Sequence, residues 1–193
     1  MDVGVLALQG DFEAHAGILN QLGASTRRVR AATDLDDLDG LVLPGGESTA
    51  MLRLMERDRL DLAIGDKVAA GLPVLATCAG VILLARRVEP TQRSLGLLEV
   101  SVIRNAYGRQ VHSSVTTIAV NGELGGPAAM EAVFIRAPRI DSIGEGVQVL
   151  GRLGKDPVLV AAGRIIAATF HPELSQDHRV HSLFCRLLDG ERS

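Results

Sequence analysis

The first half of the chain alternates short apolar runs with stretches of helical periodicity, and this alternation limits the possible folds more than any other feature. Apolar runs predict strands at residues 3–8, 25–29, 40–43 and 74–77, and helices are predicted at residues 12–22, 48–55 and 79–85. Short runs that are apolar throughout are typical of parallel strands covered by helices on both faces. The sequence therefore predicts an α/β fold, a three-layer sandwich with a mostly parallel central sheet.

The second half of the chain has a different pattern. Strands are predicted at residues 99–104, 111–120, 132–135, 147–153, 158–161 and 165–170. We expect the middle ones to form an antiparallel extension and the apolar 165–170 run to return to the central sheet. An amphipathic terminal helix is predicted from apolar residues at three- and four-residue steps, namely Val180, Leu183, Phe184, Leu187 and Leu188. Because no linker or repeat interrupts the pattern, residues 1–193 are expected to form a single domain.

Composition excludes several classes of protein. A net charge of -3, with four phenylalanines, one tyrosine and no tryptophan, predicts no nucleic-acid partner. No apolar run approaches the roughly 18–20 residues of a membrane span, so no membrane partner is expected. Two cysteines are too few for a disulfide framework, and a cytoplasmic location is the expectation.

Chemistry-bearing residues cluster in three turns that follow predicted strands. The turns are Pro44-Gly45-Gly46-Glu47-Ser48, Thr77-Cys78-Ala79-Gly80 and His171-Pro172-Glu173. Ligands of open α/β sheets bind outside the carboxyl ends of the strands, where loop amides and helix amino termini converge. These turns are therefore the candidate site.

Cys78 lies between a predicted strand and a predicted helix, with Gly80 two residues later. This order is typical of a nucleophile elbow, in which a tight turn exposes the side chain above the sheet. A thiolate at a helix start is a good nucleophile. The alternative is a buried cysteine that only packs, but packing does not require so sharp a turn.

His171 and Glu173 stand two residues apart, so extended backbone would point both side chains the same way. The carboxylate could then orient the imidazole toward the thiol of Cys78. Alone, a His-Pro-Glu sequence is more often a loop with a surface histidine, but together with Cys78 it supplies the nucleophile, base and orienting carboxylate of acyl transfer. His178 and His181 lack further metal ligands, so a solvated helix face is predicted and no metal site.

The Gly45-Gly46 pair can bring backbone amides close to a substrate at little steric cost. Together with the amide of Ala79, amides of Gly45 and Gly46 are the candidates for an oxyanion hole. The alternative is a plain turn. The pattern of a phosphate-binding loop is missing, which argues against a nucleotide triphosphatase.

Six segments together carry a family resemblance, and they are residues 8–10, 44–49, 77–80, 104–110, 134–138 and 170–174. The cysteine turn and the His-Pro-Glu sequence alone indicate class I (triad) glutamine amidotransferases. The Arg-Asn-Ala-Tyr-Gly-Arg-Gln and Phe-Ile-Arg-Ala-Pro sequences narrow the match, and the chain resembles the glutaminase subunits of pyridoxal 5'-phosphate synthase.

The resemblance implies the flavodoxin-like fold of class I amidotransferases and the hydrolysis of L-glutamine to L-glutamate and ammonia, without a cofactor. It implies that Cys78 is the nucleophile and that His171 and Glu173 complete the triad. The implied glutamine-binding residues are Gly46, Glu47, Ser48, Arg104, Ile135 and Arg136. The implied partner is a synthase subunit that receives the ammonia and builds the vitamin B6 cofactor.

The chain departs from the family pattern at two places. Ala76 replaces the first glycine of the usual Gly-x-Cys-x-Gly elbow, and His112-Ser113-Ser114-Val115 replaces Asp-Ser-Phe-Glu. Alternative functions are the glutaminase subunit of another amidotransferase, such as imidazole glycerol phosphate synthase, a noncatalytic regulatory subunit on the same fold, and a cysteine peptidase. The flexible diglycine further predicts that the isolated chain is weakly active until a partner orders this turn.

Overall fold

The computed structural model describes residues 1–104, 106 and 114–190. The strands are β1 (Asp2–Leu6), β2 (Ser25–Val29), β3 (Gly40–Leu43), β4 (Val74–Thr77), β5 (Ala85–Glu89), β6 (Leu98–Ile103), β7 (Ser114–Val120), β8 (Ala129–Phe134), β9 (Arg139–Ile143), β10 (Gln148–Leu153), β11 (Asp156–Ala162) and β12 (Ile165–Ala168). The helices are α1 (Phe12–Gln21), α2 (Ser48–Arg57), α3 (Leu60–Ala69), α4 (Ala79–Leu84) and α5 (Arg179–Leu188), with short 3₁₀ helices η1 (Ala32–Leu35), η2 (Gly122–Leu124) and η3 (Pro172–Leu174).

One large sheet runs through the described part of the chain in the order β2-β1-β3-β4-β12-β11-β10-β7-β8. Its first five strands are parallel, and the remaining four extend it with antiparallel pairs. This confirms both the parallel core and the antiparallel extension. The last predicted strand does return to the sheet centre, as β12 beside β4.

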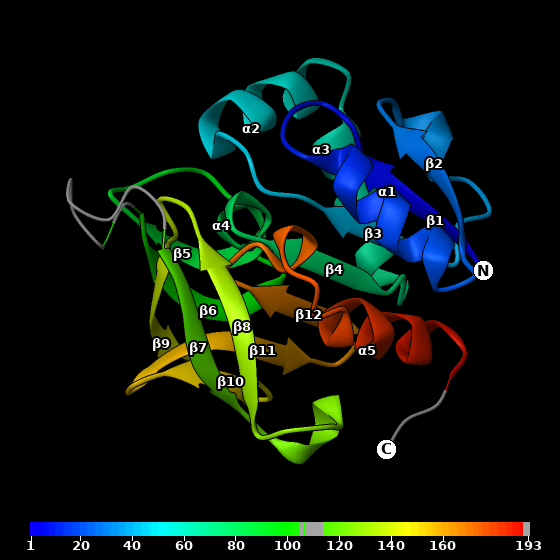
Figure 1. Ribbon diagram of the computed structural model, residues 1–193. Coiled ribbons are helices and arrows are strands. Elements are labelled where there is room, and N and C mark those ends of the chain that lie inside the picture. The colour runs from blue at the N-terminus through cyan, green and yellow to red at the C-terminus, as the bar shows by residue number, and fades with distance from the viewer. Residues whose placement is uncertain (105, 107–113, 191–193) are drawn as a thin grey trace.

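Helices cover both faces of the parallel part, as Figure 1 shows. Leu41 and Leu43 of β3 pack with α2, α3 and α4 in one apolar cluster, whereas Val42 packs with α1 and α5 in the other. Successive side chains of a strand point to opposite faces, so a fully apolar strand needs a helix layer on each side. The three-layer prediction is confirmed.

Some elements were not predicted from the sequence. A second sheet of three strands, in the order β5-β6-β9, packs on the face of the large sheet that carries α2, α3 and α4. The helix α3 was also missed. The β12 strand is two residues shorter than the predicted 165–170 run, because the amides of Thr169 and His171 bond the carbonyls of Val158 and Val133 and the chain leaves β4.

The turn between β4 and α4 packs its backbone directly against β3. A Cβ atom on Gly80 would lie 2.1 Å from the carbonyl oxygen of Leu43, so no larger residue fits. Ala76, two residues before Cys78, is fully buried and pairs with Leu43 and Ala167 as an ordinary strand residue. The elbow therefore requires the glycine after the cysteine and accommodates alanine before it.

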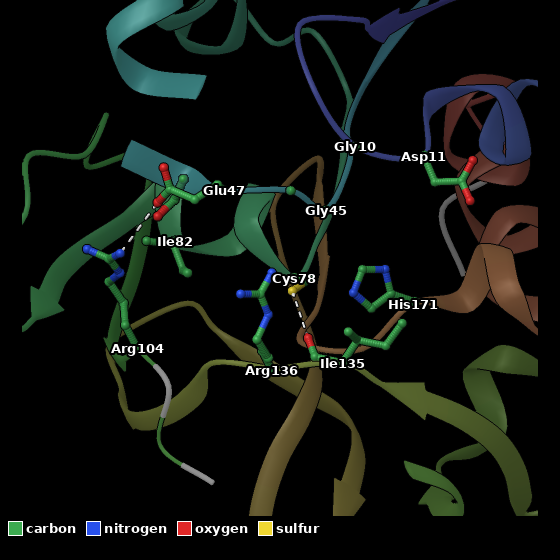
Figure 2. Close-up of a pocket in the computed structure, with 12 residues that line it drawn as sticks. Gly10, Asp11, Gly45, Glu47, Cys78, Ile82, Arg104, Ile135, Arg136 and His171 are labelled. Carbon is green, nitrogen blue, oxygen red and sulfur yellow. Dashed lines mark hydrogen bonds and ion pairs between the residues drawn. The ribbon is translucent and has the colours of Figure 1, made fainter. Parts of the chain in front are cut away.

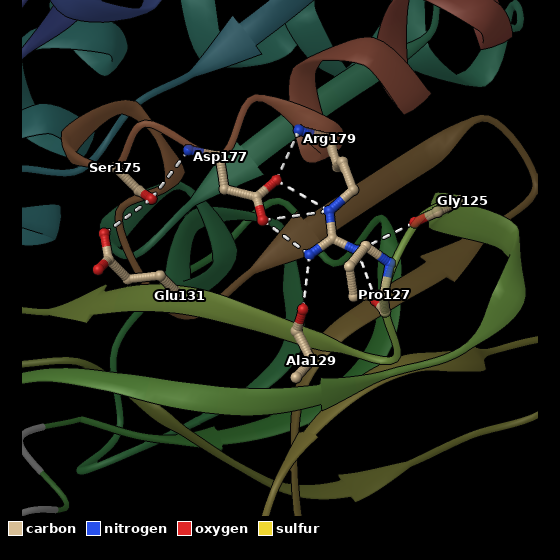
Figure 3. A network of polar contacts seen from close by, with 7 residues as sticks. All are labelled: Gly125, Pro127, Ala129, Glu131, Ser175, Asp177 and Arg179. Carbon is tan, nitrogen blue, oxygen red and sulfur yellow. Dashed lines mark hydrogen bonds and ion pairs between the residues drawn. The ribbon is translucent and has the colours of Figure 1, made fainter.

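The segment after η3 is fastened to the β7–β8 hairpin by a network of polar contacts (Figure 3). The guanidinium of Arg179 donates to the carbonyls of Gly125, Pro127 and Ala129, at 2.9, 2.7 and 2.8 Å, and pairs with Asp177. The hydroxyl of Ser175 donates to Glu131 on β8 at 3.1 Å. These contacts fix the chain between η3 and α5, after the change in direction that follows β12.

We predict that Gly80→Ala destabilises the fold by about 3 kcal/mol, because the added methyl group overlaps a backbone oxygen that cannot move without disturbing β3. Thermal or denaturant unfolding of the purified chain measures this. Gly65→Ala in α3 is the matched control, since a Cβ there meets nothing within 4 Å. The control should gain about 0.5–1 kcal/mol. Equal stabilities for the two variants would contradict the packing described for the elbow.

Candidate active site

The carboxyl ends of β1, β3 and β4 and the segments after β8 and β12 surround a cavity of about 310 Å³ (Figure 2). Every predicted turn contributes to its wall. The lining residues are Gly10, Asp11, Gly45, Gly46, Glu47, Ser48, Cys78, Ile82, Arg104, Ile135, Arg136 and His171. Of the predicted site residues, only Ala79 and Glu173 lie outside this lining: Ala79 follows Cys78 in α4, and Glu173 stands behind His171.

Cys78 occupies the predicted elbow between β4 and α4. Its backbone is left-handed, with φ 47° and ψ -102°, and its side chain is buried. Left-handed backbone in a residue other than glycine costs about 1–3 kcal/mol and is found most often at functional sites. The Sγ atom faces the carbonyl oxygen of Ile135 at 3.8 Å, which places it at the floor of the cavity.

His171 lies beside Cys78 in the cavity (Figure 2). A Cβ atom on Gly45 would come within 2.4 Å of His171 Cε1 and 3.4 Å of Cys78 Cβ, so the diglycine turn closes against both. The structure therefore brings a sulfur and an imidazole 93 positions apart in sequence to one edge of the sheet.

The Nδ1 atom of His171 is 2.7 Å from Glu173 Oε1, and the Glu173 side chain is fully buried. Because an ionised carboxylate only accepts, Nδ1 carries the proton in this contact. The expected extended backbone is wrong here, since Pro172–Leu174 form the 3₁₀ helix η3. Proline is favoured at the first position of a helix, so Pro172 is well suited to start this turn.

The predicted glutamine-binding residues line the same cavity. The carboxylate of Glu47 caps α2 by accepting from the amides of Thr49 and Ala50, at 3.0 and 2.7 Å, and lies 3.6 Å from the Arg104 guanidinium. Arg136 is exposed, left-handed at φ 44°, and makes no ion pair with any described residue. The wall thus presents two guanidinium groups to an anionic ligand.

The Gly45-Gly46 turn lies against the β1–α1 loop. A Cβ atom on Gly10 would lie 1.7 Å from the Gly45 carbonyl oxygen, and the Gln9 side chain accepts a hydrogen bond from the Glu47 amide at 2.9 Å. The Gly46 amide is trans to that carbonyl across one peptide plane, so it points away from Gly10. Of the loop that carries Arg104, residues 105 and 107–113 lie outside the described residues, and so do His112 and Ser113 of the second departure.

Comparison with known proteins places this site in a family. The model of the SNO glutamine amidotransferase family matches residues 5–189. The chain belongs to the SNO glutamine amidotransferase family. It is 50% identical over 192 residues to a protein of Parafrankia sp. and 47% identical over 197 residues to one of Koribacter versatilis, each named "Pyridoxal 5'-phosphate synthase subunit PdxT". The first comparison covers 98% of this chain and 94% of the relative, and the second covers 100% and 98%.

Solved structures agree with this assignment. A crystal structure of a glutamine amidotransferase superposes with a TM-score of 0.89 at 44% identity, covering 97% of this chain and 98% of that chain. A glutamine amidotransferase from Thermotoga maritima has a TM-score of 0.65 at 14% identity, covering 98% and 83%, and shows the shared fold alone. The predicted class I amidotransferase fold is confirmed.

In this SNO family site the charge states of His171 and Glu173 are set by their neighbours, which outweigh the effect of burial. Burial by itself lowers the pKa of His171, but hydrogen bonds and negative charge from Cys78 and Glu173 overcome it and raise the pKa to about 10. Burial by itself raises the pKa of Glu173, but His15 and His171 hold it well below its usual value. In the resting site the imidazolium of His171 is therefore paired with the carboxylate of Glu173.

Sequence reasoning missed His15, which is fully buried on α1 with its Nε2 atom 3.2 Å from Glu173 Oε2. It also placed His181 wrongly on a solvated face, because the residue is fully buried at the contact of α5 with α1 and lies 3.0 Å from His15 Nδ1. No described group of three His, Cys, Asp or Glu residues could hold a metal ion. The sequence did contain one signal of burial: His15 lies within the apolar periodicity of residues 12–22.

We predict that Glu173→Gln moves the alkaline limb of the pH–rate profile to lower pH. The raised pKa of His171 keeps its imidazolium protonated up to about pH 10, and we expect this imidazolium to act as the acid for the leaving ammonia. Removing the carboxylate lowers that pKa by about one to three units, so activity is lost earlier as pH rises. The kcat/KM for glutamine as a function of pH measures the shift.

The exposed Glu145 provides the control, since Glu145→Gln removes the same charge far from the cavity lining. The control profile should match that of the unaltered chain. An unchanged alkaline limb in Glu173→Gln would mean that this carboxylate does not govern the His171 proton.

Proposed function

We propose that this chain is the glutaminase subunit of a pyridoxal 5'-phosphate synthase, hydrolysing L-glutamine with a Cys78-His171-Glu173 triad and delivering ammonia to a synthase subunit. One observation carries the proposal: a strained cysteine and an imidazole paired with a buried carboxylate meet in a single cavity. Relatives 47–50% identical over nearly the whole chain carry the PdxT name. That similarity favours this reading over a subunit of imidazole glycerol phosphate synthase.

In the first half of the reaction the Cys78 thiolate attacks the carbonyl carbon of the glutamine side-chain amide. The negative oxygen that forms is placed near the amides of Gly46 and Ala79, where an oxyanion hole stabilises charge that develops only in the transition state. The imidazolium of His171 then gives its proton to the departing nitrogen, the C–N bond breaks, and ammonia leaves. A glutamyl thioester remains on Cys78.

In the second half, water attacks the thioester while neutral His171 takes its proton. The C–S bond breaks, the product leaves as the carboxylic acid and gives its proton to solvent to become glutamate, and the thiolate–imidazolium pair is restored. Glu173 holds the imidazole in one tautomer throughout, with Nε2 turned to the reacting atoms. Atoms and charges balance over the cycle, and the chain's own groups supply each proton transfer before product release.

The same cavity accounts for recognition of an amino acid. A guanidinium holds a carboxylate through paired hydrogen bonds, and Arg104 and Arg136 are both within the lining. Glu47 already balances Arg104, so Arg136 is the better placed of the two for the substrate carboxylate. Glu47, Ser48 and the Ile135 backbone complete the binding wall in this proposal.

No described helix is long and apolar enough to cross a membrane. A cytoplasmic location and the lack of a nucleic-acid partner stay predictions.

We predict that Cys78→Ala abolishes ammonia release from glutamine while the fold is retained. The change removes the nucleophilic sulfur and leaves a residue of similar size, so the unfolding temperature should change little. The matched control is Cys185→Ala, which alters the other cysteine, on α5. Ammonia release at the control's level by Cys78→Ala would refute the proposed mechanism, and so would a failure of glutamine-analogue electrophiles to label Cys78.

We further predict that the chain releases ammonia slowly alone and much faster with the synthase subunit. The Gly45-Gly46 peptide can adopt more than one orientation, and a partner that binds the competent one raises its population. Steady-state rates with and without the subunit test this, at glutamine concentrations well above KM. Equal rates would show that the oxyanion hole is complete in the isolated chain.

A further inference from the structure

His15 is a buried titratable residue for which the triad mechanism has no role. It lies on α1, and no part of it is exposed to solvent. Its ring contacts three polar side chains from three other elements: Thr77 on β4, Glu173 on η3 and His181 on α5. All three are buried as well. Polar groups brought together at the centre of a fold, directly behind a catalytic cavity, call for a chemical explanation.

The carboxylate of Glu173 has two oxygens in the interior and a different partner for each. Oε1 accepts from His171 Nδ1 at 2.7 Å. Oε2 is buried and lacks an aligned hydrogen bond within the described chain, but His15 Nε2 lies 3.2 Å away. A buried carboxylate without a donor for one of its oxygens is strongly disfavoured. His15 therefore provides the compensating contact for the second oxygen.

The neighbours of His15 determine which of its nitrogens carries a proton. Burial, together with the charge of His15, lowers the pKa of His181 to about 3, so His181 is neutral. His181 Nδ1 is buried and has no hydrogen-bond partner among the described residues, so the proton of a neutral His181 belongs on Nε2, which donates to His15 Nδ1. The proton of the His15 ring is then on Nε2. The remaining tautomer would set a nitrogen lone pair against the Glu173 oxygen.

The same Nε2 atom is 3.2 Å from Thr77 Oγ1, and Thr77 directly precedes Cys78. One nitrogen thus touches the end of the strand that presents the nucleophile and the carboxylate that orients the base. It is carried on α1, which is anchored in the core by Leu19 one turn further along the same face.

We propose that His15 is a positioning residue for glutamine hydrolysis: it holds the second carboxylate oxygen of Glu173, so that the first oxygen stays on His171. Without this donor, the carboxylate would rotate toward another group or take up a proton, and either change weakens its hold on the imidazole. His15 touches neither substrate nor sulfur, so its effect falls on the chemical step. This inference rests on the proposed glutaminase function.

The test compares His15→Gln with His15→Asn in the full chain assembled with the synthase subunit. The glutamine amide reaches the place of the imidazole Nε2, whereas the shorter asparagine amide reaches only that of Nδ1. We expect His15→Asn to lower kcat about 10- to 100-fold, the effect of losing one polar contact to a buried charged group. His15→Gln should recover most of the activity, with KM for glutamine nearly constant in both.

A double-mutant cycle of His15→Asn and Glu173→Gln separates a positioning role of His15 from a packing role. If His15 acts through Glu173, adding His15→Asn to Glu173→Gln should cost less than about threefold in kcat, because the interaction is already lost. Ile64→Ala on α3, in the apolar cluster on the other face of the sheet, is the packing control, and it should lower the unfolding temperature and leave kcat unchanged.

Three outcomes would overturn the inference: equal kcat for His15→Gln and His15→Asn, a loss confined to KM, or the same loss in the Glu173→Gln background as in the unaltered chain. The proposed function fails separately, if the unaltered complex releases no ammonia from glutamine. Unfolding temperatures of each variant, measured in parallel, distinguish loss of fold from loss of positioning.

Discussion

The contact between His171 and the buried carboxylate of Glu173 is the interaction on which the rest of the site depends. An imidazolium in the interior is unstable unless a negative group is held against it, and a carboxylate there is equally unstable without donors. Each group makes the other's charge more tolerable, and with the help of Cys78 the pKa of His171 rises, while with the help of His15 that of Glu173 falls, despite burial. The protonated base beside Cys78 follows from this pairing. Anything that holds the carboxylate in place, including His15, therefore affects the nucleophile two contacts away.

The sheet supplies the precision that this pairing needs. β4 and β12 are adjacent and parallel, with Thr77 opposite Ala168, and the Cys78 amide donates to the Ala168 carbonyl at 2.8 Å. Cys78 and the segment that leads to His171 thus leave the sheet at the same edge, because each directly follows the last paired residue of its strand. After Ala168 the amide of His171 bonds Val133 on β8, which directs the chain across the cavity rather than away from it. A parallel crossover converts a separation of 93 positions in sequence into direct proximity.

The parts of this arrangement that sequence predicted are those set by local chemistry. The apolar runs that became β3 and β4 were placed with the bounds they have, since buried parallel strands allow few polar residues. The β5 strand was missed because its exposed Arg86 and Arg87 interrupt the alternation. α3 was missed because it begins at left-handed Arg59 without a side-chain cap and contains Gly65. His15 was missed for another reason: nothing local marks a histidine as a partner of a glutamate 158 positions away, and only the packing of α1 on η3 brings them together.

Strain at the cavity indicates which parts of the site the fold must hold rigidly. Of the described residues other than glycine, four have positive φ, and two of these, Cys78 and Arg136, face the cavity. Each such backbone costs about 1–3 kcal/mol and persists only where its surroundings fix it. For Cys78 the surroundings are the backbone contact of Gly80 with Leu43 and the amide bond to Ala168. The Gly45-Gly46 turn has no side chains of its own that could fix its backbone in this way. Under the proposed mechanism the site combines a fixed nucleophile and base with an adjustable peptide, so that control by a partner would act on the peptide alone.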